Sequence, residues 1–353
     1  MAEKSAIPVE LGTEKIGRLL KQYALPAIIA QTASSLYNMV DSIFIGQGVG
    51  PLAISGLAVT FPLMNLSTAF GTLVGAGAAT MLSVLLGQKN YKAANKVLGN
   101  VVSLNVILGL LFMAVALIFI DPILYFFGAS ENTLPYAKEY IQIILYGNIV
   151  THLYFGLNAA MRSSGNPKKA MALTIFTVVF NTILDPIFIF GMNMGVAGAA
   201  WATFISRCAM MGIGIAILLS GKLYKRYLGD IRIRALNIKQ FKEVMKTSFP
   251  ISFQGLIEVT TFSIAGIMAG WFGEIAMAAH QASQTIITFS FMVAQGVGVA
   301  ATIRVSHQYG EGRFADARKA GFAASHISIA LMALAGISFI IFNDVIPYIF
   351  TQD

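Results

Sequence analysis

The chain has 353 residues, of which 56% are hydrophobic and only 11% are charged, and its formal net charge is +8. Soluble domains contain about 25% charged residues, so this composition excludes a disordered chain and argues against a soluble enzyme. The single cysteine, Cys208, lies inside an apolar block, which excludes a disulfide bond within the chain.

Long apolar blocks predict an all-α integral membrane protein, because about 20 apolar residues in a helix match the hydrocarbon thickness of a bilayer. In chain order, we predict nine spans at residues 23–46, 52–86, 97–120, 136–160, 169–190, 196–219, 248–270, 276–308 and 317–342. The second and eighth spans are longer than a membrane is thick, so we expect them to tilt or protrude. Gly75, Gly296 and Gly298 inside them are expected to permit bending or close helix contact.

The basic residues alternate between loops and predict the orientation of the chain. Of 24 Lys and Arg residues, 21 fall in the N-terminal segment and in loops of one parity. Lys138 lies alone on the other side, Arg207 and Arg304 lie within spans, and we expect Arg304 to extend its head group to the interface. The bias places the N-terminus on the cytoplasmic side of a plasma or inner membrane. It also explains the net charge, so no nucleic-acid partner is expected.

The sequence repeats itself at an interval of about 223 residues. Matched pairs are Pro26 and Pro250, Ser83 and Ser306, Gly87 and Gly310, and Asp121 and Asp344. Six spans separate the copies, so both begin on the same side of the membrane. We therefore predict an N-terminal six-helix lobe at residues 1–220, a basic cytoplasmic linker at 221–246 and an incomplete C-terminal lobe of three helices at 247–353.

The repeat also predicts that a complete second lobe would add three more spans. The two-lobe helical bundle would then have twelve helices, nine of them present, with about 90 to 100 residues missing after Asp353. The alternative is a natural nine-span protein.

Four oxygen-bearing side chains share one predicted depth in the first lobe. At 1.5 Å per residue, Asp41 and Asp185 each lie about 7 Å inside the outer end of a span and Thr203 lies about 9 Å inside, while Asn181 lies one turn below Asp185 on the same helix face. Two nearby carboxylates need a bound proton or a hard cation between them, and carboxylate, amide and hydroxyl oxygens suit such a cation. The cluster therefore predicts a proton or Na⁺ site. The alternative for Asp185, which precedes Pro186, is that it only ends a helix near the interface.

Other polar residues within spans are candidates for a substrate cavity. Near mid-membrane, Glu258 is expected to attract a cationic substrate or to bind a second proton, unless it only joins helices. Arg207 is also near mid-membrane, where it pairs with an acid or lines a water-filled cavity. Weaker candidates, which line a cavity or only join helices, are Tyr37, Asn38, Gln254 and Gln284.

The sequence contains no phosphate-binding loop, no HExxH motif and no paired CxxC motif. We therefore expect no cofactor, no ATP and no enzymatic activity.

Four stretches resemble the multidrug and toxic compound extrusion (MATE) family of the bacterial and archaeal type. They are Leu36-Tyr-Asn-Met-Val-Asp41, Met161-Arg-Ser-Ser-Gly-Asn-Pro-Lys168, Asn181-Thr-Ile-Leu-Asp185-Pro186 and Gly195-Val-Ala-Gly-Ala-Ala-Trp-Ala-Thr203. The resemblance covers residues 11–353 and implies two six-helix lobes around a central cavity. It further implies that Asp41, Asn181, Asp185 and Thr203 form the first-lobe cation site. Glu258 stands where one subgroup has a second-lobe acid.

The function that the resemblance implies is secondary active multidrug efflux, in which cationic or amphipathic organic molecules are exchanged for H⁺ or Na⁺. We expect a monomer surrounded by lipid. One alternative is a flippase for lipid-linked precursors, but such proteins have a more cationic cavity, whereas here the intramembrane acids outnumber Arg207. Another is an intramembrane enzyme, for which the sequence shows no nucleophile–base or metal constellation.

Overall fold

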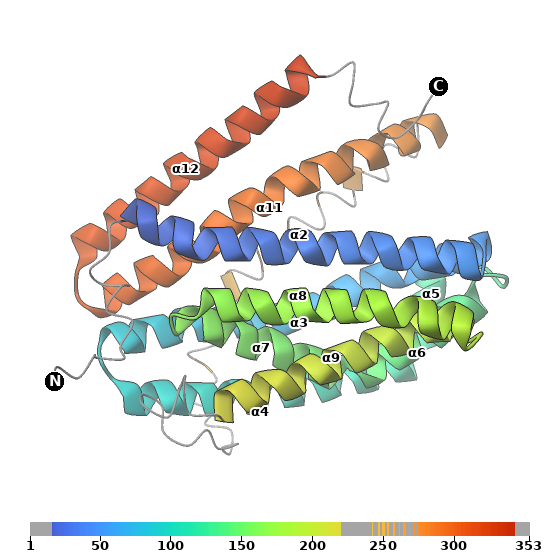
Figure 1. The fold of residues 1–353 in the computed structure, drawn as a ribbon, viewed down its shortest axis with the longest axis horizontal. Coiled ribbons are helices and arrows are strands. Elements are labelled where there is room, and N and C mark those ends of the chain that lie inside the picture. The colour runs from blue at the N-terminus through green and yellow to red at the C-terminus, as the bar shows by residue number, and fades with distance from the viewer. Residues whose placement is uncertain are drawn as a thin grey trace.

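A computed structural model describes residues 16–219 and 274–342, together with isolated positions between 242 and 272. Within these ranges every regular element is a helix, which confirms the all-α class (Figure 1). The predicted seventh span, 248–270, and the linker lie outside the described ranges.

The helices follow the predicted spans closely at most positions. In chain order they are α2 (Ile16–Gly48), α3 (Pro51–Gly87), α4 (Tyr91–Ile118), α5 (Ile120–Phe126), α6 (Leu134–Tyr146), α7 (Asn148–Ser163), α8 (Pro167–Pro186), the π-helix η1 (Ile187–Gly191), α9 (Gly195–Leu219), α11 (Glu274–Gly310) and α12 (Phe314–Ile341). The span predicted at 136–160 is instead two helices, α6 and α7, that meet at Gly147. Phe204 of α9 packs closely against this glycine, where a side chain would collide with its ring.

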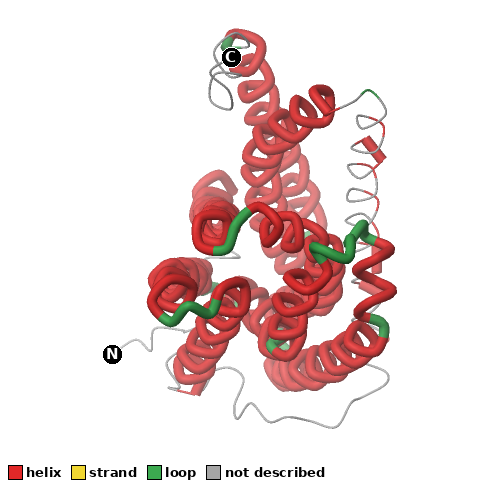
Figure 2. The backbone as a smooth tube through the Cα atoms, turned by 90° about the vertical axis from the view of Figure 1, so that its right-hand side faces the viewer, coloured by secondary structure: helices red, strands yellow, loops and turns green. Residues whose placement is uncertain are grey.

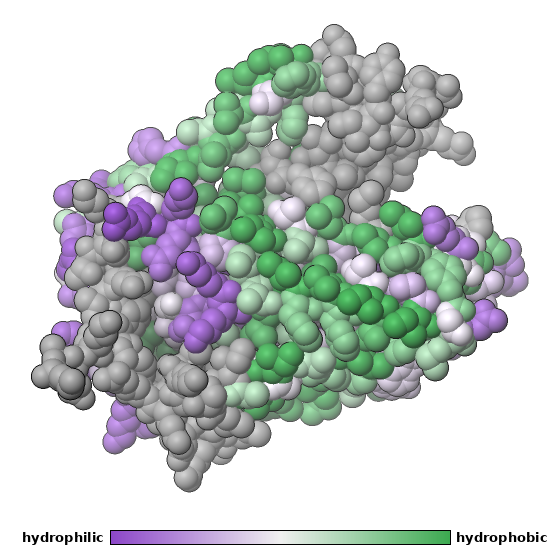
Figure 3. All heavy atoms as spheres, viewed as in Figure 1, coloured by the Kyte–Doolittle hydropathy of each residue, from purple (hydrophilic) through white to green (hydrophobic). Residues whose placement is uncertain are grey.

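Among the described residues, five helices are long and apolar enough to cross a membrane. They are Leu52–Gly87, Tyr91–Ile118, Pro167–Gly191, Gly195–Ala216 and Phe314–Ile341. Apolar side chains cover the middle of the visible surface, while hydrophilic ones gather toward its two ends (Figure 3). These helices support the prediction that the chain is a membrane protein, whereas the number of nine spans stays a prediction.

Two turns at one end of the bundle have the same backbone geometry, as the internal repeat predicts. Asn90 precedes α4 with φ −90° and ψ 69°, and Arg313 precedes α12 with φ −88° and ψ 63°. The preceding residues, Lys89 and Gly312, have positive φ values of 57° and 76°. The amide of Asn90 donates to the Leu85 carbonyl at 2.9 Å, and the amide of Arg313 makes the equivalent 2.9 Å bond. We call this end, which carries Lys89 and Arg313, the basic end.

Helices α2 to α9 pack into one bundle with its own cores, seen nearly end-on in Figure 2. Helix α3 packs on α7 and α4, and α8 packs on α2 and α9. One core cluster, around Ile45, Leu124 and Tyr140, lies toward the end opposite the basic end. A second cluster, around Leu86 and Met161, lies at the basic end.

Helices α11 and α12 lie beside α2, and α11 contacts both α2 and α3 (Figure 1). A third apolar cluster joins them at the basic end, where Leu19 and Tyr23 of α2 meet Val297 and Ile303 of α11. Toward the opposite end, α11 and α12 diverge from the bundle (Figure 1). The two parts of the molecule are therefore closed against each other at the basic end.

Two glycines at equivalent repeat positions permit this close approach. A Cβ atom on Gly87 would collide with the backbone carbonyl of His307, and a Cβ atom on Gly310 would collide with that of Val84. The expectation of close contact also holds for Gly296, against which Ile28 packs, but a Cβ atom on Gly298 would meet nothing within 4 Å.

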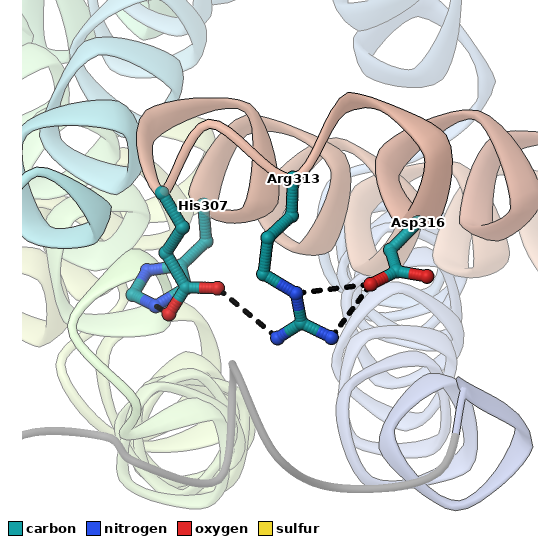
Figure 4. A network of polar contacts seen from close by, with 4 residues as sticks. His307, Arg313 and Asp316 are labelled. Carbon is teal, nitrogen blue, oxygen red and sulfur yellow. Dashed lines mark hydrogen bonds and ion pairs between the residues drawn. The ribbon is translucent and has the colours of Figure 1, made fainter.

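The turn between α11 and α12 is held by charged side chains (Figure 4). Arg313 donates from Nε and Nη2 to Asp316 at 2.9 and 2.7 Å, and its Nη1 lies 3.3 Å from Glu311. Hydrogen bonding to Asp316 raises the pKa of Arg313. The expectation that Arg304 reaches to the interface is wrong, because its side chain is only 2% exposed and Gln308 packs against it.

Candidate cation site

Three helices bring the four predicted residues together. Asp41 lies in the last third of α2, Asn181 and Asp185 lie one turn apart on α8, and Thr203 lies on α9. Their exposed fractions are 4%, 2%, 0% and 2%, so all four are buried inside the bundle. The sequence predicted this convergence because the four residues lie at a similar depth in three spans. In the structure, the packing of α8 on both α2 and α9 brings them together.

An amide at the centre links the cluster. The Nδ2 of Asn181 donates to Oδ1 of Asp185 at 3.3 Å and to Oγ1 of Thr203 at 3.4 Å. The carboxylates of Asp41 and Asp185 are close enough to repel each other when both are charged. Such a pair is stable only if a proton or a cation is shared between the two groups.

Two tyrosines complete the polar surroundings of Asp41. The Tyr37 hydroxyl, one turn earlier on α2, lies 2.8 Å from Oγ1 of Thr203. The Tyr140 hydroxyl of α6 donates to the Asp41 carboxylate and is itself buried. Sequence reasoning missed Tyr140. It lies one turn inside the predicted span 136–160, at the same depth as Asp41, so the depth argument could have found it.

Three oxygens of the cluster remain available for a bound ion. Within the described residues, Oδ1 of Asp41, Oδ1 of Asn181 and Oδ2 of Asp185 are buried and accept no hydrogen bond. A buried acceptor without a donor costs free energy, which a bound proton or metal ion would recover. Carboxylate and amide oxygens are ligands that a hard cation prefers, so the residues present fit either H⁺ or Na⁺.

Helix α8 does not end at Asp185, contrary to the alternative considered from the sequence. It continues through Pro186 into the π-helical turn η1, and Ile189 of that turn is buried. Proline lacks the backbone N–H that would bond the preceding turn, and a π-helical turn accommodates this loss. Asp185 therefore has helical residues before and after it in the chain, and its side chain is buried inside the bundle.

The remaining predicted residues fall into two groups. Arg207 lies one turn from Thr203 on α9 and is half-buried, and its Nη1 donates to Oγ1 of Thr151 on α7 at 2.9 Å. It forms no ion pair with an acid among the described residues. The side chains of Asn38, Gln254, Glu258 and Gln284 lie outside the described residues, so their assignment to a substrate cavity stays a prediction.

A second group of buried polar side chains joins α3 to α7. Ser67 hydrogen-bonds to Asn148, and its Oγ lies 3.3 Å from Nε2 of His152. Asn148 also donates to the Gly109 carbonyl of α4 at 3.2 Å. Because these side chains largely satisfy one another, they join three helices as polar packing.

The fold and its apolar helices define a polytopic helical membrane protein, and the paired buried acids within it offer oxygens to a cation. The family model named MatE matches residues 26–187 and 250–353, which is more than half of the chain. The chain belongs to the MatE family.

Related proteins agree with this assignment. The multidrug export protein MepA of Staphylococcus haemolyticus is 29% identical over 286 residues, which is 80% of this chain and 62% of that relative. This chain therefore spans less than two thirds of that relative's length.

Two solved structures share the fold. The crystal structure of MATE in the straight conformation is 25% identical with a TM-score of 0.87, covering 100% of this chain and 78% of its own. The outward-facing structure of a multidrug resistance MATE family transporter of the MOP superfamily has a TM-score of 0.89 at 24% identity. It covers 99% of this chain and 77% of its own. These relatives are exporters and transporters, in agreement with the expectation of a transport protein rather than an enzyme.

Proposed function

We propose that this chain forms part of a secondary active exporter that couples inward movement of H⁺ or Na⁺ to outward movement of organic molecules. The observation that carries the proposal is the buried pair of Asp41 and Asp185, whose unpartnered oxygens would bind the coupling cation together with Asn181 and Thr203. Buried ionisable groups at membrane depth are costly, and in transporters they mark ion pathways.

In this proposal, the cation acts by favouring one arrangement of the two lobes over the other. When no cation is bound, Asp41 and Asp185 repel each other across the contact between α2 and α8. Binding removes that repulsion and draws the two helices together. Pro26 inside α2 is a point where the helix can bend. A difference in cation affinity between the two arrangements then drives the exchange.

The exported molecules in this proposal are organic cations or amphipathic drugs. They would bind in a cavity between the lobes, with Tyr37, Asn38, Gln254, Glu258, Gln284 and Arg207 as candidate lining residues. The protein acts as a monomer in the plasma or inner membrane, with its N-terminus in the cytoplasm and without ATP. The basic end then faces the cytoplasm, in accord with the bias of Lys and Arg toward that side.

The test is efflux of a fluorescent organic cation from proteoliposomes under a proton gradient or a sodium gradient, each imposed alone. We expect one gradient to drive efflux by the wild-type exporter of which this chain forms part, and Asp41→Asn and Asp185→Asn each to abolish it. Either change leaves a single acid in the cluster and so removes the paired site.

Asp121→Asn is the matched control. Asp121 pairs with Lys138 at 2.8 Å on the surface, away from the cluster, so we expect this substitution to leave efflux unchanged. Efflux that survives in both site variants would contradict the proposal. Wild-type protein that responds to neither gradient would instead favour the flippase alternative.

A further inference from the structure

Polar side chains continue from the cation site through the interior of the first lobe toward the basic end. Thr203, which accepts from Asn181 at the cation site, lies one turn from Arg207 on α9. Arg207 reaches across to Thr151 on α7, at 2.9 Å. Residues four apart on a helix lie on one face, so Thr203 and Arg207 are neighbours along this route.

The route continues along α7. Tyr154 lies one turn beyond Thr151, and its hydroxyl is 2.6 Å from Oγ1 of Thr174 on α8. Asn158 donates from Nδ2 to the Tyr154 hydroxyl at 3.4 Å. Arg162, in the last turn of α7 at the basic end, donates to Oδ1 of Asn158 at 2.6 Å.

This arrangement differs from scattered polar packing because hydrogen-bonded pairs, placed one helical turn apart, lead from the cation site to the basic end of the lobe. Thr151, Asn158, Thr174 and Thr203 are all buried, although they lie within apolar helices. Buried hydroxyl and amide groups in a line can pass a proton or hold water that solvates a small cation. A carrier that couples two fluxes must prevent such a passage, because cations that cross alone dissipate the gradient.

Arg207 occupies the middle of this polar route. It lies twelve residues from each end of α9. Its charge is felt by Tyr37 and Asp41 on one side and by Tyr154 on the other. Among the described residues no acid forms an ion pair with it, so its positive charge is not neutralised by a partner there.

We propose that Arg207 is an electrostatic barrier that stops cations from leaking out of the cation site through the polar interior of the first lobe. A fixed guanidinium carries a positive charge that repels both H⁺ and Na⁺ in a low-dielectric interior. Arginine and helix-dipole charges exclude cations in this way in other membrane pores. The inference rests on the proposed cation coupling, and it gives Arg207 a role in addition to its candidate place in the substrate cavity.

The test measures cation leak through reconstituted protein without any organic substrate. Proteoliposomes are given an inward proton gradient or an inward sodium gradient, and uptake is followed with an internal pH dye or with radioactive sodium. Removing one opposing charge should raise the leak by about tenfold or more. We expect this increase in Arg207→Gln and Arg207→Met, and little change in Arg207→Lys.

A second pair of changes tests whether the leak follows the route described. Tyr154→Phe combined with Thr174→Val removes the two hydroxyls at the basic-end half and should suppress the leak of Arg207→Gln. A leak caused by poor folding would persist in that combination, and persistence would overturn the proposal. A leak that appears in Arg207→Lys but not in Arg207→Gln would also overturn it, because it would follow the geometry of the side chain and not its charge.

The leak assay is independent of the test of the proposed function. Failure of that function would appear as wild-type protein without gradient-driven efflux. Failure of the barrier would appear as unchanged leak in both neutral variants, whether or not the wild type exports.

Discussion

Tyr140 shows how one hydroxyl on α6 completes a cluster formed by three other helices. Its hydroxyl donates to Asp41, so it holds one carboxylate oxygen and leaves the other free of hydrogen bonds. The same bond competes with a proton or cation for the electrons of that carboxylate. In the proposed cation site, this bond gives Tyr140 a part in setting the affinity for the cation.

Removing this hydroxyl should raise the apparent affinity for the driving cation, because the competing hydrogen bond is lost. A hydrogen bond to a charged group contributes about 1.5 to 3 kcal/mol, so we expect Tyr140→Phe to lower the half-saturating cation concentration by about tenfold or more. The measurement is the rate of efflux as a function of external cation concentration.

Tyr136→Phe is the matched control for Tyr140→Phe. Tyr136 lies one turn earlier on α6 and packs at the edge of the same apolar core. An equal shift in both variants would show that the effect comes from packing and not from the bond to Asp41.

At the scale of elements, α8 shows why local signals mislead at a functional position. A proline at position 186 indicates a helix end, yet α8 continues as the π-helical turn η1. The turn packs Ile189 into the core beside Gly48, where a Cβ atom would lie 2.5 Å from the Ile189 side chain. Tertiary packing therefore stabilises a local conformation that the sequence disfavours, as is common for π-helices near functional sites.

The contact between α3 and α11 also depends on single residues. Gly87 and Gly310 each face a backbone carbonyl of the other helix, which cannot move aside as a side chain can. Gly310→Ala should therefore push the two helices apart at the basic end and lower the free energy of unfolding by about 1 to 3 kcal/mol. Thermal unfolding of the purified protein in detergent measures the change.

Gly298→Ala is the control for Gly310→Ala. Gly298 lies on the same helix, and a Cβ atom there would meet nothing within 4 Å. Alanine is favoured over glycine within a helix by about 0.8 to 1.0 kcal/mol, so this change should be neutral or stabilising. Equal destabilisation by the two substitutions would contradict the role of the close contact at Gly310.

At the scale of the whole molecule, the distribution of charge predicts which end of the bundle faces the cytoplasm. Exposed Gln88 lies at the basic end, and exposed Asn132 lies in the connection between α5 and α6 at the other end. In a Cys208→Ser background, Asn132→Cys should react with a membrane-impermeant maleimide added to intact cells. Gln88→Cys should react only after the cells are permeabilised. The reverse labelling pattern would invert the proposed orientation.

Composition and periodicity were sufficient to predict the class of fold, because a helix buried in lipid must be apolar along its length. The positions of Asp41, Asn181, Asp185 and Thr203 along those helices then predicted that the four residues lie at a similar depth in the membrane. Depth does not give rotation about a helix axis, so it could not show that Asn181 bridges Asp185 to Thr203, or that Tyr140 faces Asp41.

The sequence by itself thus determined the apolar helices, the internal repeat that pairs Gly87 with Gly310, the charge bias and the candidate residues. These follow from local chemistry and from spacing along the chain. Only the tertiary structure decided the partner of Arg207, the burial of Arg304, the break at Gly147 and the continuation of α8 past Pro186. Each of these depends on a neighbouring helix far away in sequence, whose packing can outweigh the local preference of the chain.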